Sequence, residues 1–284
     1  MKLTEINIRD PFVLQYGGVY YMYGTRVGIP RPDALWGEQT GFDVYKSKDL
    51  ENWSEAKSVF EFSDSFWATK QAWAPEVHYY NGKFYMLASF RSEERRRATQ
   101  ALVSESPEGP FEVFGEPLTP TDWDCLDGTL YVEDHIPYLV FCHEWGQIGD
   151  GEIVMIQLKE DLSATIGQPM VLFKASESGW AEEIRSGDKK GIVTDGPWLA
   201  KDEGNLLMFW SSFHNGRYAV GIVVSESGKL AGPWRHSEKL LFEKDGGHGM
   251  LFESLEGKRY FALHQPNGAR LERPRFFEIE KLCY

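Results

Sequence analysis

The segment DGPWLAKDEGNLLMFWSSF, residues 195–213, has the pattern of two strands joined by a tight turn. A polar head, D-G-P, precedes a short apolar run, and the residues D-E-G separate this run from a second one that is rich in aromatic residues. Asp, Gly and Pro each favour turns for their own backbone reasons, and a short Gly-containing loop between two apolar runs is typical of a β-hairpin. The segment therefore predicts an antiparallel hairpin, and its meaning depends on whether the pattern recurs.

The pattern recurs four more times along the chain. The other copies are DPFVLQYGGVYYMYGT (10–25), EVHYYNGKFYMLASF (76–90), DGTLYVEDHIPYLVFCHEW (127–145) and HGMLFESLEGKRYFALHQP (248–266). Their heads are 51 to 68 residues apart, which leaves room for about four strands of ~5–6 residues with their loops, the content of one propeller blade. We therefore predict an all-β fold, a five-bladed β-propeller with four antiparallel strands per blade, in which residues 1–284 form a single domain. A β-sandwich is the alternative, but its strands need not recur in sets of four.

Charge and composition narrow the possible partners. The net charge is −13 and the pI is near 5.1, so we expect no nucleic-acid partner and no anionic membrane surface. No run of ~18 apolar residues and no N-terminal signal core is present in the sequence, which predicts a cytoplasmic protein. The three cysteines lack metal-like spacing and are expected to be reduced thiols. One basic cluster, residues 91–100, is predicted to be a solvated loop, with a site for an acidic sugar group as the alternative.

The heads of the five segments are all ionisable. Innermost propeller strands run side by side around a central channel, so residues at equivalent positions form a ring at its mouth. The predicted ring consists of Asp10, Glu76, Asp127, Asp195 and His248. Crowded carboxyl groups shift one another's pKa values and raise the pKa of at least one acid, which makes it a candidate proton donor. Inverting glycoside hydrolysis needs such a set, with a carboxylic acid and a carboxylate about 6.5–9.5 Å apart. The alternative, that each head only caps a turn, does not require ionisable residues at all five positions.

At these motifs the sequence resembles glycoside hydrolase family 43, five-bladed propellers that cleave arabinose, xylose and related linkages with inversion. The resemblance covers nearly the whole chain. R-D-P-F-V is similar to the family segment that carries the general base, which implies that role for Asp10. W-A-P-E-V implies that Trp73 shapes the sugar pocket, and LDGTLYV implies that Asp127 tunes the acid. GGHGMLF resembles the motif whose histidine helps to hold a hydrated cation. The resemblance therefore implies that a structural calcium can bind near His248, and it implies no required cofactor.

The fourth unit departs from the family pattern. The family commonly has E-G-P with Glu as general acid, whereas this chain has Asp195 in T-D-G-P. The missing methylene shortens the reach of the carboxyl group by about 1.3 Å, and a misplacement of ~1 Å can cost ~100-fold in rate. The acid is therefore either Asp195, or Glu144, or one of the pair Glu182 and Glu183. A site that binds sugar without hydrolysis is the remaining alternative.

The resulting hypothesis is a glycosidase of the α-L-arabinofuranosidase or β-xylosidase type that acts on oligosaccharides. The predicted catalytic residues are Asp10, Asp127 and Asp195. The predicted substrate-binding residues are Trp73, Glu76, Glu144, Trp145 and His248, the last also a candidate metal ligand. The competing functions are a non-catalytic carbohydrate-binding propeller and a phosphorolytic one, which would need Arg or Lys at the axis. Three further indoles fall in loop-like segments and are expected to pack between blades rather than on sugar: Trp36, Trp67 and Trp123.

Overall fold

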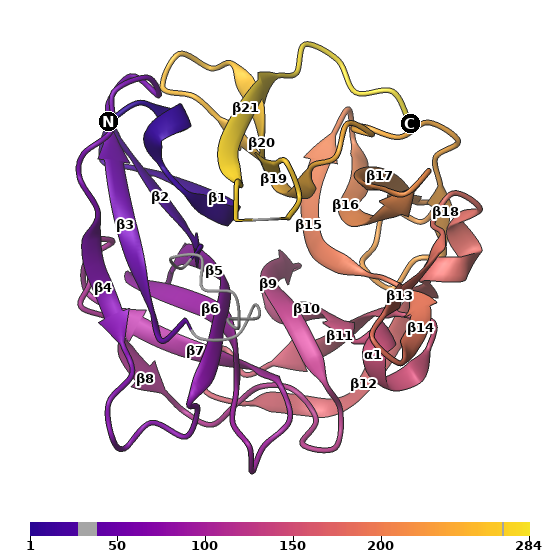
Figure 1. Ribbon diagram of the computed structural model, residues 1–284, viewed down its shortest axis with the longest axis horizontal. Coiled ribbons are helices and arrows are strands. Elements are labelled where there is room, and N and C mark those ends of the chain that lie inside the picture. The colour runs from indigo at the N-terminus through magenta and orange to yellow at the C-terminus, as the bar shows by residue number, and fades with distance from the viewer. Residues whose placement is uncertain (28–38, 269) are drawn as a thin grey trace.

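Five antiparallel sheets follow one another around a central axis (Figure 1). The computed structural model describes residues 1–27, 39–268 and 270–284. The first blade contains β1 (Ile8–Tyr16), β2 (Val19–Arg26), β3 (Gly41–Ser47) and β4 (Lys57–Glu61). The second contains β5 (Lys70–Tyr80), β6 (Lys83–Arg91), β7 (Ala98–Ser104) and β8 (Glu112–Phe114). The third contains β9 (Cys125–Glu133), β10 (Ile136–His143), β11 (Glu152–Leu158) and β12 (Thr165–Lys174).

The fourth and fifth blades complete the circle. The fourth contains β15 (Asp195–Asp202), β16 (Asn205–His214), β17 (Arg217–Ser225) and β18 (Trp234–His236). The fifth contains β19 (Gly247–Glu253), β20 (Arg259–Gln265) and β21 (Arg273–Glu278). Between the third and fourth blades lie the short helix α1 (Trp145–Ile148) and the hairpin of β13 (Glu183–Ser186) and β14 (Lys189–Ile192). Two 3-10 turns, η1 (Leu3–Glu5) and η2 (Ala175–Ser178), complete the described elements.

The predicted five-bladed propeller is confirmed, with one correction to the strand count. Four blades have four strands, and the fifth has three among the described residues. After β21 the chain does not pair with that strand again but packs on the fourth blade, where Leu282 is buried. There the Tyr284 hydroxyl accepts a hydrogen bond from Asn205 at 3.1 Å. At the other end of the chain, Arg273 in β21 donates a hydrogen bond to the carbonyl of Thr4 at 3.0 Å, which ties the last blade to the N-terminal segment.

The middle strands of the blades are buried on both faces. Each blade is covered by its neighbours, so these strands read as continuous apolar runs rather than as alternating ones. In β6 and β17 every residue between the first and the last is buried. Burial of apolar surface contributes about 25 cal/mol per Å², and here it accumulates between blades. Trp210, fully buried, packs against Trp180 and Phe173 in this way.

The five innermost strands β1, β5, β9, β15 and β19 each carry a β-bulge close to the axis. At each bulge one residue has a positive φ, between 46° and 57°: Asp10, Ala74, Asp127, Gly196 and His248. These residues are the true equivalents, and they correct the predicted ring in two blades. In the second blade the position belongs to Ala74, two residues before Glu76, and in the fourth it belongs to Gly196, one residue after Asp195. The bulge turns the strand locally, so a shift by one residue changes where a side chain points.

Candidate active site

A cavity of about 240 Å³ opens at the axis beside the bulges. It contains seven of the residues predicted from the sequence: Asp10, Trp73, Asp127, Glu144, Trp145, Asp195 and His248. It adds four that the sequence analysis did not identify as site residues: Arg9, Thr25, Arg97 and Leu126. Arg9, Trp73, Leu126 and Asp195 each occupy the position before a bulge residue, so two successive positions of the inner strands supply most of the lining.

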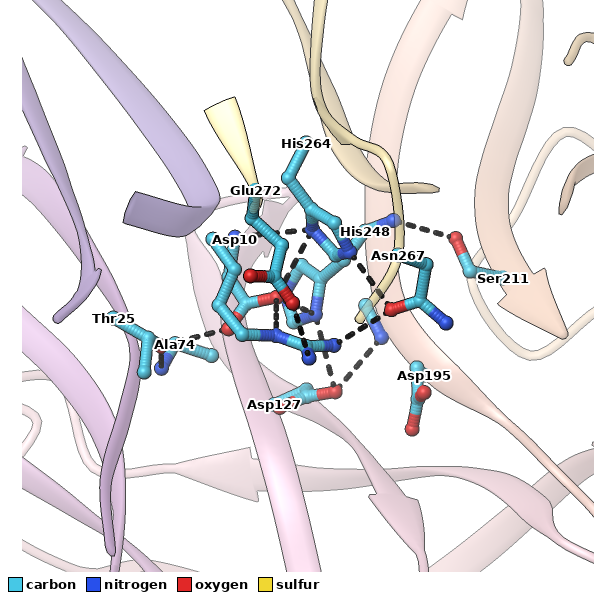
Figure 2. Close-up of polar contacts among 12 residues, drawn as sticks. Asp10, Thr25, Ala74, Asp127, Asp195, Ser211, His248, His264, Asn267 and Glu272 are labelled. Carbon is cyan, nitrogen blue, oxygen red and sulfur yellow. Dashed lines mark hydrogen bonds and ion pairs between the residues drawn. The ribbon is translucent and has the colours of Figure 1, made fainter. Parts of the chain in front are cut away.

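Side chains from neighbouring blades satisfy the bulge N–H groups. In four blades, a side chain on the second strand accepts a hydrogen bond from the bulge residue of the next blade at 2.7–3.2 Å. These pairs are Thr25 with Ala74, Ser89 with Asp127, Ser211 with His248 and His264 with Asp10 (Figure 2 shows all but the second). The third blade has Cys142 at this position, because Cys142 pairs with Leu126 as Thr25 pairs with Arg9. The N–H of Gly196 instead donates to Oδ2 of Asp127 at 2.9 Å, which joins the backbone beside Asp195 to a second carboxyl group.

Asp10 is a buried carboxylate surrounded by donors and cations (Figure 2). The Thr25 hydroxyl donates to Oδ2 at 2.7 Å, Arg9 Nε donates to Oδ1 at 3.3 Å, and Nδ1 of His248 lies 3.3 Å from Oδ1. Burial by itself raises the pKa of Asp10, but the charges of His248 and Arg9 outweigh it and hold the pKa well below its usual range. Asp10 is therefore ionised at neutral pH and can accept a proton.

His264 holds the backbone of Asp10 as a neutral imidazole. Its Nδ1 accepts the N–H of Asp10 at 3.2 Å, and its Nε2 lies 3.1 Å from Oδ1 of Asn267, so the proton is on Nε2. The ring is fully buried, and burial together with the charge of Arg9 lowers the pKa of His264. Arg9 also lies 3.6 Å from the carboxylate of Glu272, which is fully buried. The base candidate is thus fixed from the fifth blade at both its backbone and its carboxylate.

Asp127 and Asp195 behave in the opposite way to Asp10. Burial raises the pKa of Asp127 to about 7, although His248 acts against this rise, and burial raises the pKa of Asp195 to about 6, although a hydrogen bond from Tyr218 opposes it. Asp195 adds to the rise at Asp127 through its own charge. Two buried carboxyl groups that interact in this way titrate as a pair, which holds a proton near neutral pH. The site therefore contains a carboxylate and a proton donor in the same cavity.

His248 carries the balancing positive charge. Its Nδ1 lies 3.3 Å from Asp10 and 3.5 Å from Asp127. Burial lowers the pKa of His248, but the charges of Asp10, Asp127 and Asp195 outweigh burial and raise it. The imidazole thus pairs with carboxylates of the first and third blades.

The imidazole of His248 does not fit a calcium site by itself. Calcium takes six to eight oxygen ligands, while Nδ1 of His248 is directed at two carboxylates that already have other partners. Across residues 1–27, 39–268 and 270–284, no group of three or more His, Cys, Asp or Glu side chains is arranged to hold a metal. The calcium near His248 stays a prediction, and no step proposed below passes through a cation.

One wall of the cavity is an ion pair between the second and third blades. Arg97 donates to Oε2 of Glu144 through Nη1, and its Nε donates to Gln71 at 3.0 Å. The guanidinium also lies over the Trp73 ring, with Cζ 4.5 Å from the ring centroid. Both partners are largely buried, with side chains 7% and 14% exposed. A carboxylate that accepts one hydrogen bond from an arginine keeps further acceptor sites, so Glu144 is suited to bind sugar hydroxyls.

Three other carboxyl groups from the sequence analysis do not reach the cavity. Glu76 is buried, and its Oε2 lies 3.2 Å from Nε2 of His78. His78 stacks on Trp198 in a separate cavity of about 420 Å³. Glu182 and Glu183, the alternative acids, are exposed and lie outside the lining. Of the candidate general acids named from the sequence, only Asp195 and Glu144 line the cavity.

The basic cluster and the loop tryptophans were also predicted from the sequence. The cluster 91–100 is not simply a solvated loop, because Arg97 is 6% exposed, and Arg91 and Arg96 both donate to Asp124. The chemical signal for Arg9 and Arg97 was present in R-D-P and R-R-R, but only the folded chain brings both to the axis. Trp67 contacts Phe66 and Phe90, and Trp123 stacks on His143, as expected for packing. Trp36 lies outside the described residues.

Comparison with known proteins identifies the family. A five-bladed propeller with a carboxylate and a proton-holding acid pair at its axis has the groups that a carbohydrate-cleaving enzyme of the inverting class requires. The model of glycosyl hydrolases family 43 matches residues 3–278. The chain therefore belongs to glycosyl hydrolases family 43, and it is an inverting glycosidase that hydrolyses O-glycosyl bonds. The resemblance seen in the motifs is confirmed.

Individual relatives agree with this assignment. The chain is 38% identical to an endo-arabinase of Bacteroides thetaiotaomicron, whose crystal structure matches with a TM-score of 0.91 over 99% of this chain and 97% of that one. It is 24% identical to a β-D-galactofuranosidase of Aspergillus niger, over 90% of this chain and 72% of the relative. It is 26% identical to a xylosidase/arabinosidase of Humicola insolens, over 92% and 73%. In the described residues, no helix is long and apolar enough to cross a membrane. The cytoplasmic location stays a prediction.

Proposed function

We propose that the chain cleaves α-L-arabinofuranosyl or β-xylosyl linkages in short oligosaccharides, with Asp10 as general base and Asp195 as general acid. Asp127 tunes and orients the acid. The observation that carries this proposal is the contrast in protonation around one cavity, where the pKa of Asp10 is held low while the pKa values of Asp127 and Asp195 are raised. Pairs of carboxyl groups whose environments push their pKa values apart are the acid and base of such enzymes.

The chemical step follows from these assignments. Asp10 accepts a proton from a water molecule, whose oxygen attacks the anomeric carbon from the face opposite the leaving group. Asp195 donates its proton to the glycosidic oxygen as the bond to the anomeric carbon breaks, so the product sugar has the inverted configuration. Asp10 ends protonated and Asp195 ionised, and exchange with water restores both. His248 stays positively charged beside the carboxylates throughout, and the step needs no cofactor.

The lining supports recognition of one sugar ring beside the acid and base. The cavity of about 240 Å³ is smaller than the ~300–1,000 Å³ of typical drug-sized ligand sites. Trp73 and Trp145 supply flat apolar surfaces, and Glu144 and Arg97 supply an acceptor and a donor on the same wall. Aromatic faces with a few convergent polar groups are the usual composition of a sugar site.

The names of the relatives suggest the substrates to test. The endo-arabinase, the xylosidase/arabinosidase and the β-D-galactofuranosidase act, by their names, on arabinan, on xylosides or arabinosides, and on galactofuranosides. The test panel contains arabino-, xylo- and galactofuranosyl oligosaccharides and the matching 4-nitrophenyl glycosides. We expect release of a pentose. NMR spectra recorded in the first minutes should show that the product has the inverted anomeric configuration.

Two variants test the assigned roles. Asp10→Asn keeps a residue that tolerates the positive φ of 54° at this position, and it removes the base. We expect a rate loss of about 10²–10⁴-fold on every substrate. Asp195→Asn should lose activity mainly on natural oligosaccharides, because a 4-nitrophenolate leaves without protonation. Sugar binding with no product from the folded wild type would move the assignment to a non-catalytic carbohydrate-binding propeller, the function that the shorter acid side chain would favour.

A further inference from the structure

Asp195 is held by a buried tyrosine of its own blade. The Tyr218 hydroxyl, on β17, donates a hydrogen bond to Oδ2 of Asp195 at 2.8 Å. Tyr218 is 1% exposed, and burial together with the charge of Asp195 raises the pKa of Tyr218 well above its usual value, so it stays a donor. Asp195 lines the cavity, and the described residues provide no hydrogen bond to its other oxygen, Oδ1.

The tyrosine ring is fixed on several sides. It stacks on His264, with ring centroids 5.6 Å apart and an interplanar angle of 20°, and it contacts Phe213 at a centroid distance of 5.3 Å. Gly247 lies against its edge, because a Cβ added at Gly247 would be 2.6 Å from Cε1 of the tyrosine. Because the ring is held in place on these sides, the position of its hydroxyl is fixed. The hydrogen bond therefore fixes the position of the Asp195 carboxyl group.

The direction of this hydrogen bond determines where the acid carries its proton. An oxygen that accepts the Tyr218 O–H is the favoured carbonyl-like oxygen of a neutral carboxyl group, which leaves the acidic hydrogen on the other oxygen. We propose that Tyr218 is a positioning residue that fixes the short Asp195 side chain and keeps its transferable proton on Oδ1, towards the cavity. This inference rests on the proposed role of Asp195 as general acid.

The arrangement limits the freedom of the shorter acid side chain. An aspartate turns about two side-chain bonds, and a misplacement of ~1 Å in a reacting group can cost ~100-fold. The hydrogen bond from Tyr218 removes one of those rotations. The same ring rests on His264, whose Nδ1 accepts the N–H of Asp10. One packed unit therefore sets the positions of both acid and base.

The pH dependence of the reaction separates this role from a purely structural one. The charged groups that act on Asp195 are Asp127, Glu144, His248 and Arg9, from the first, third and fifth blades. All of them remain when the tyrosine hydroxyl is removed. The hydrogen bond lowers the pKa of Asp195, so its loss raises that pKa. The basic limb of the kcat/KM profile should move to higher pH.

The experiment compares Tyr218→Phe with the wild-type enzyme on two substrates. The substitution keeps the ring and deletes only the hydroxyl. We expect kcat/KM on the natural oligosaccharide to fall by about tenfold or more, because the lost hydrogen bond is one to the negative charge that develops on Asp195 as it transfers its proton. We expect kcat/KM on the 4-nitrophenyl glycoside to fall much less. The ratio of the two values does not depend on the fraction of folded protein. Tyr23→Phe is the matched control, because Tyr23 is also buried and its hydroxyl donates to the carbonyl of Pro107, away from the site.

Asp195→Asn is measured in parallel and separates two kinds of failure. If Asp195→Asn is impaired only on the natural substrate while Tyr218→Phe matches the wild type in both ratio and pH profile, the positioning inference is wrong and the acid assignment stands. An equal loss on both substrates with an unmoved basic limb also overturns it. If Asp195→Asn keeps wild-type activity on the natural substrate, the acid assignment itself is wrong. The double variant should be no worse than Asp195→Asn alone, because no acid is left to position.

Discussion

Nδ1 of His248, in the fifth blade, lies 3.3 Å from Oδ1 of Asp10, in the first. Both residues have a positive φ, 46° and 54°, and both are buried. Their charges support each other, because the pKa of Asp10 is lowered and the pKa of His248 is raised by their proximity. The base and its counter-ion thus form one electrostatic unit across the junction of the last and first blades.

The variant His248→Asn should move both limbs of the pH–rate profile to higher pH. Loss of the imidazolium removes a charge that lowers the pKa values of Asp10, Asp127 and Asp195. Asn tolerates the positive φ of the site. The matched control is His135→Asn, since His135 also has a positive φ, 67°, but is exposed in a turn. A profile of kcat/KM from pH 4 to 9 tests this, because the acidic limb of the wild type lies below that range. A variant that shows no acidic limb within the range and an unmoved basic limb would contradict the role of the histidine.

Asp127→Asn should stabilise the fold, and more at pH 8 than at pH 4. The folded-state pKa of Asp127 is raised to about 7 from an ordinary 3.8, so its stabilising contribution is present below about pH 4 and is lost as the pH rises towards 7. An uncharged amide avoids that loss. One pKa unit corresponds to about 1.4 kcal/mol, so a gain of at least ~1 kcal/mol, or ~2–4 °C in melting temperature, is expected at pH 8. Equal melting temperatures of variant and wild type at both pH values would refute the raised pKa.

Glu144→Gln should weaken substrate binding, and Glu76→Gln should not. Glu144 lines the cavity and pairs with Arg97, whereas Glu76 pairs with His78 outside it. Loss of a hydrogen bond to a charged acceptor is worth about 1.5–3 kcal/mol, so Glu144→Gln should raise KM by about tenfold or more, and Glu76→Gln should leave KM unchanged. Steady-state kinetics on one oligosaccharide decide the matter. A raised KM in Glu76→Gln would restore its place in the substrate site.

Gly196→Ala should damage both stability and activity. Gly196 has a φ of 54°, and an added Cβ would lie 2.8 Å from Cδ2 of His248. Gly204→Ala is the control, because Gly204 has a φ of 87° and no atom within 4 Å of an added Cβ. Both variants carry a left-handed backbone cost of about 1–2 kcal/mol, and overpacking at Gly196 adds about 1–3 kcal/mol. Calorimetry of the two variants measures the difference. Similar losses in both would mean that His248 can move aside.

The sequence was sufficient for the blades because each hairpin is a local pattern. Short apolar runs and the Gly-containing turns between them lie close together in the sequence, and their recurrence implied the ring. The heads were harder to place, because a bulge shifts the register within each inner strand. The correct alignment is visible afterwards in the prolines, since Pro11, Pro75 and Pro197 each follow a bulge residue. With that guide, Glu76 would not have been aligned with Asp10.

Contacts between side chains on different strands could not be read from the sequence. Arg97 belongs to a charge cluster whose usual behaviour is solvation, and only the folded second blade places it on Trp73 and brings it to Glu144 of the third blade. Tyr218 lies two residues after an Asn-Gly turn, where nothing in the sequence marks it, and its role is visible only because its hydroxyl donates a hydrogen bond to Asp195. Such relationships depend on the relative placement of segments far apart in the chain.

The hydrogen bond from the backbone of Asp10 to His264 spans the seam where the circular arrangement of blades closes. The base is therefore supported by the end of the chain that lies furthest from it in sequence. If the first and last blades separate, Asp10 loses its contacts with His264 and His248. The contacts among the second, third and fourth blades remain. Activity therefore depends on the contact between the first and last blades. During mild denaturation, activity should be lost before the other blades separate from one another.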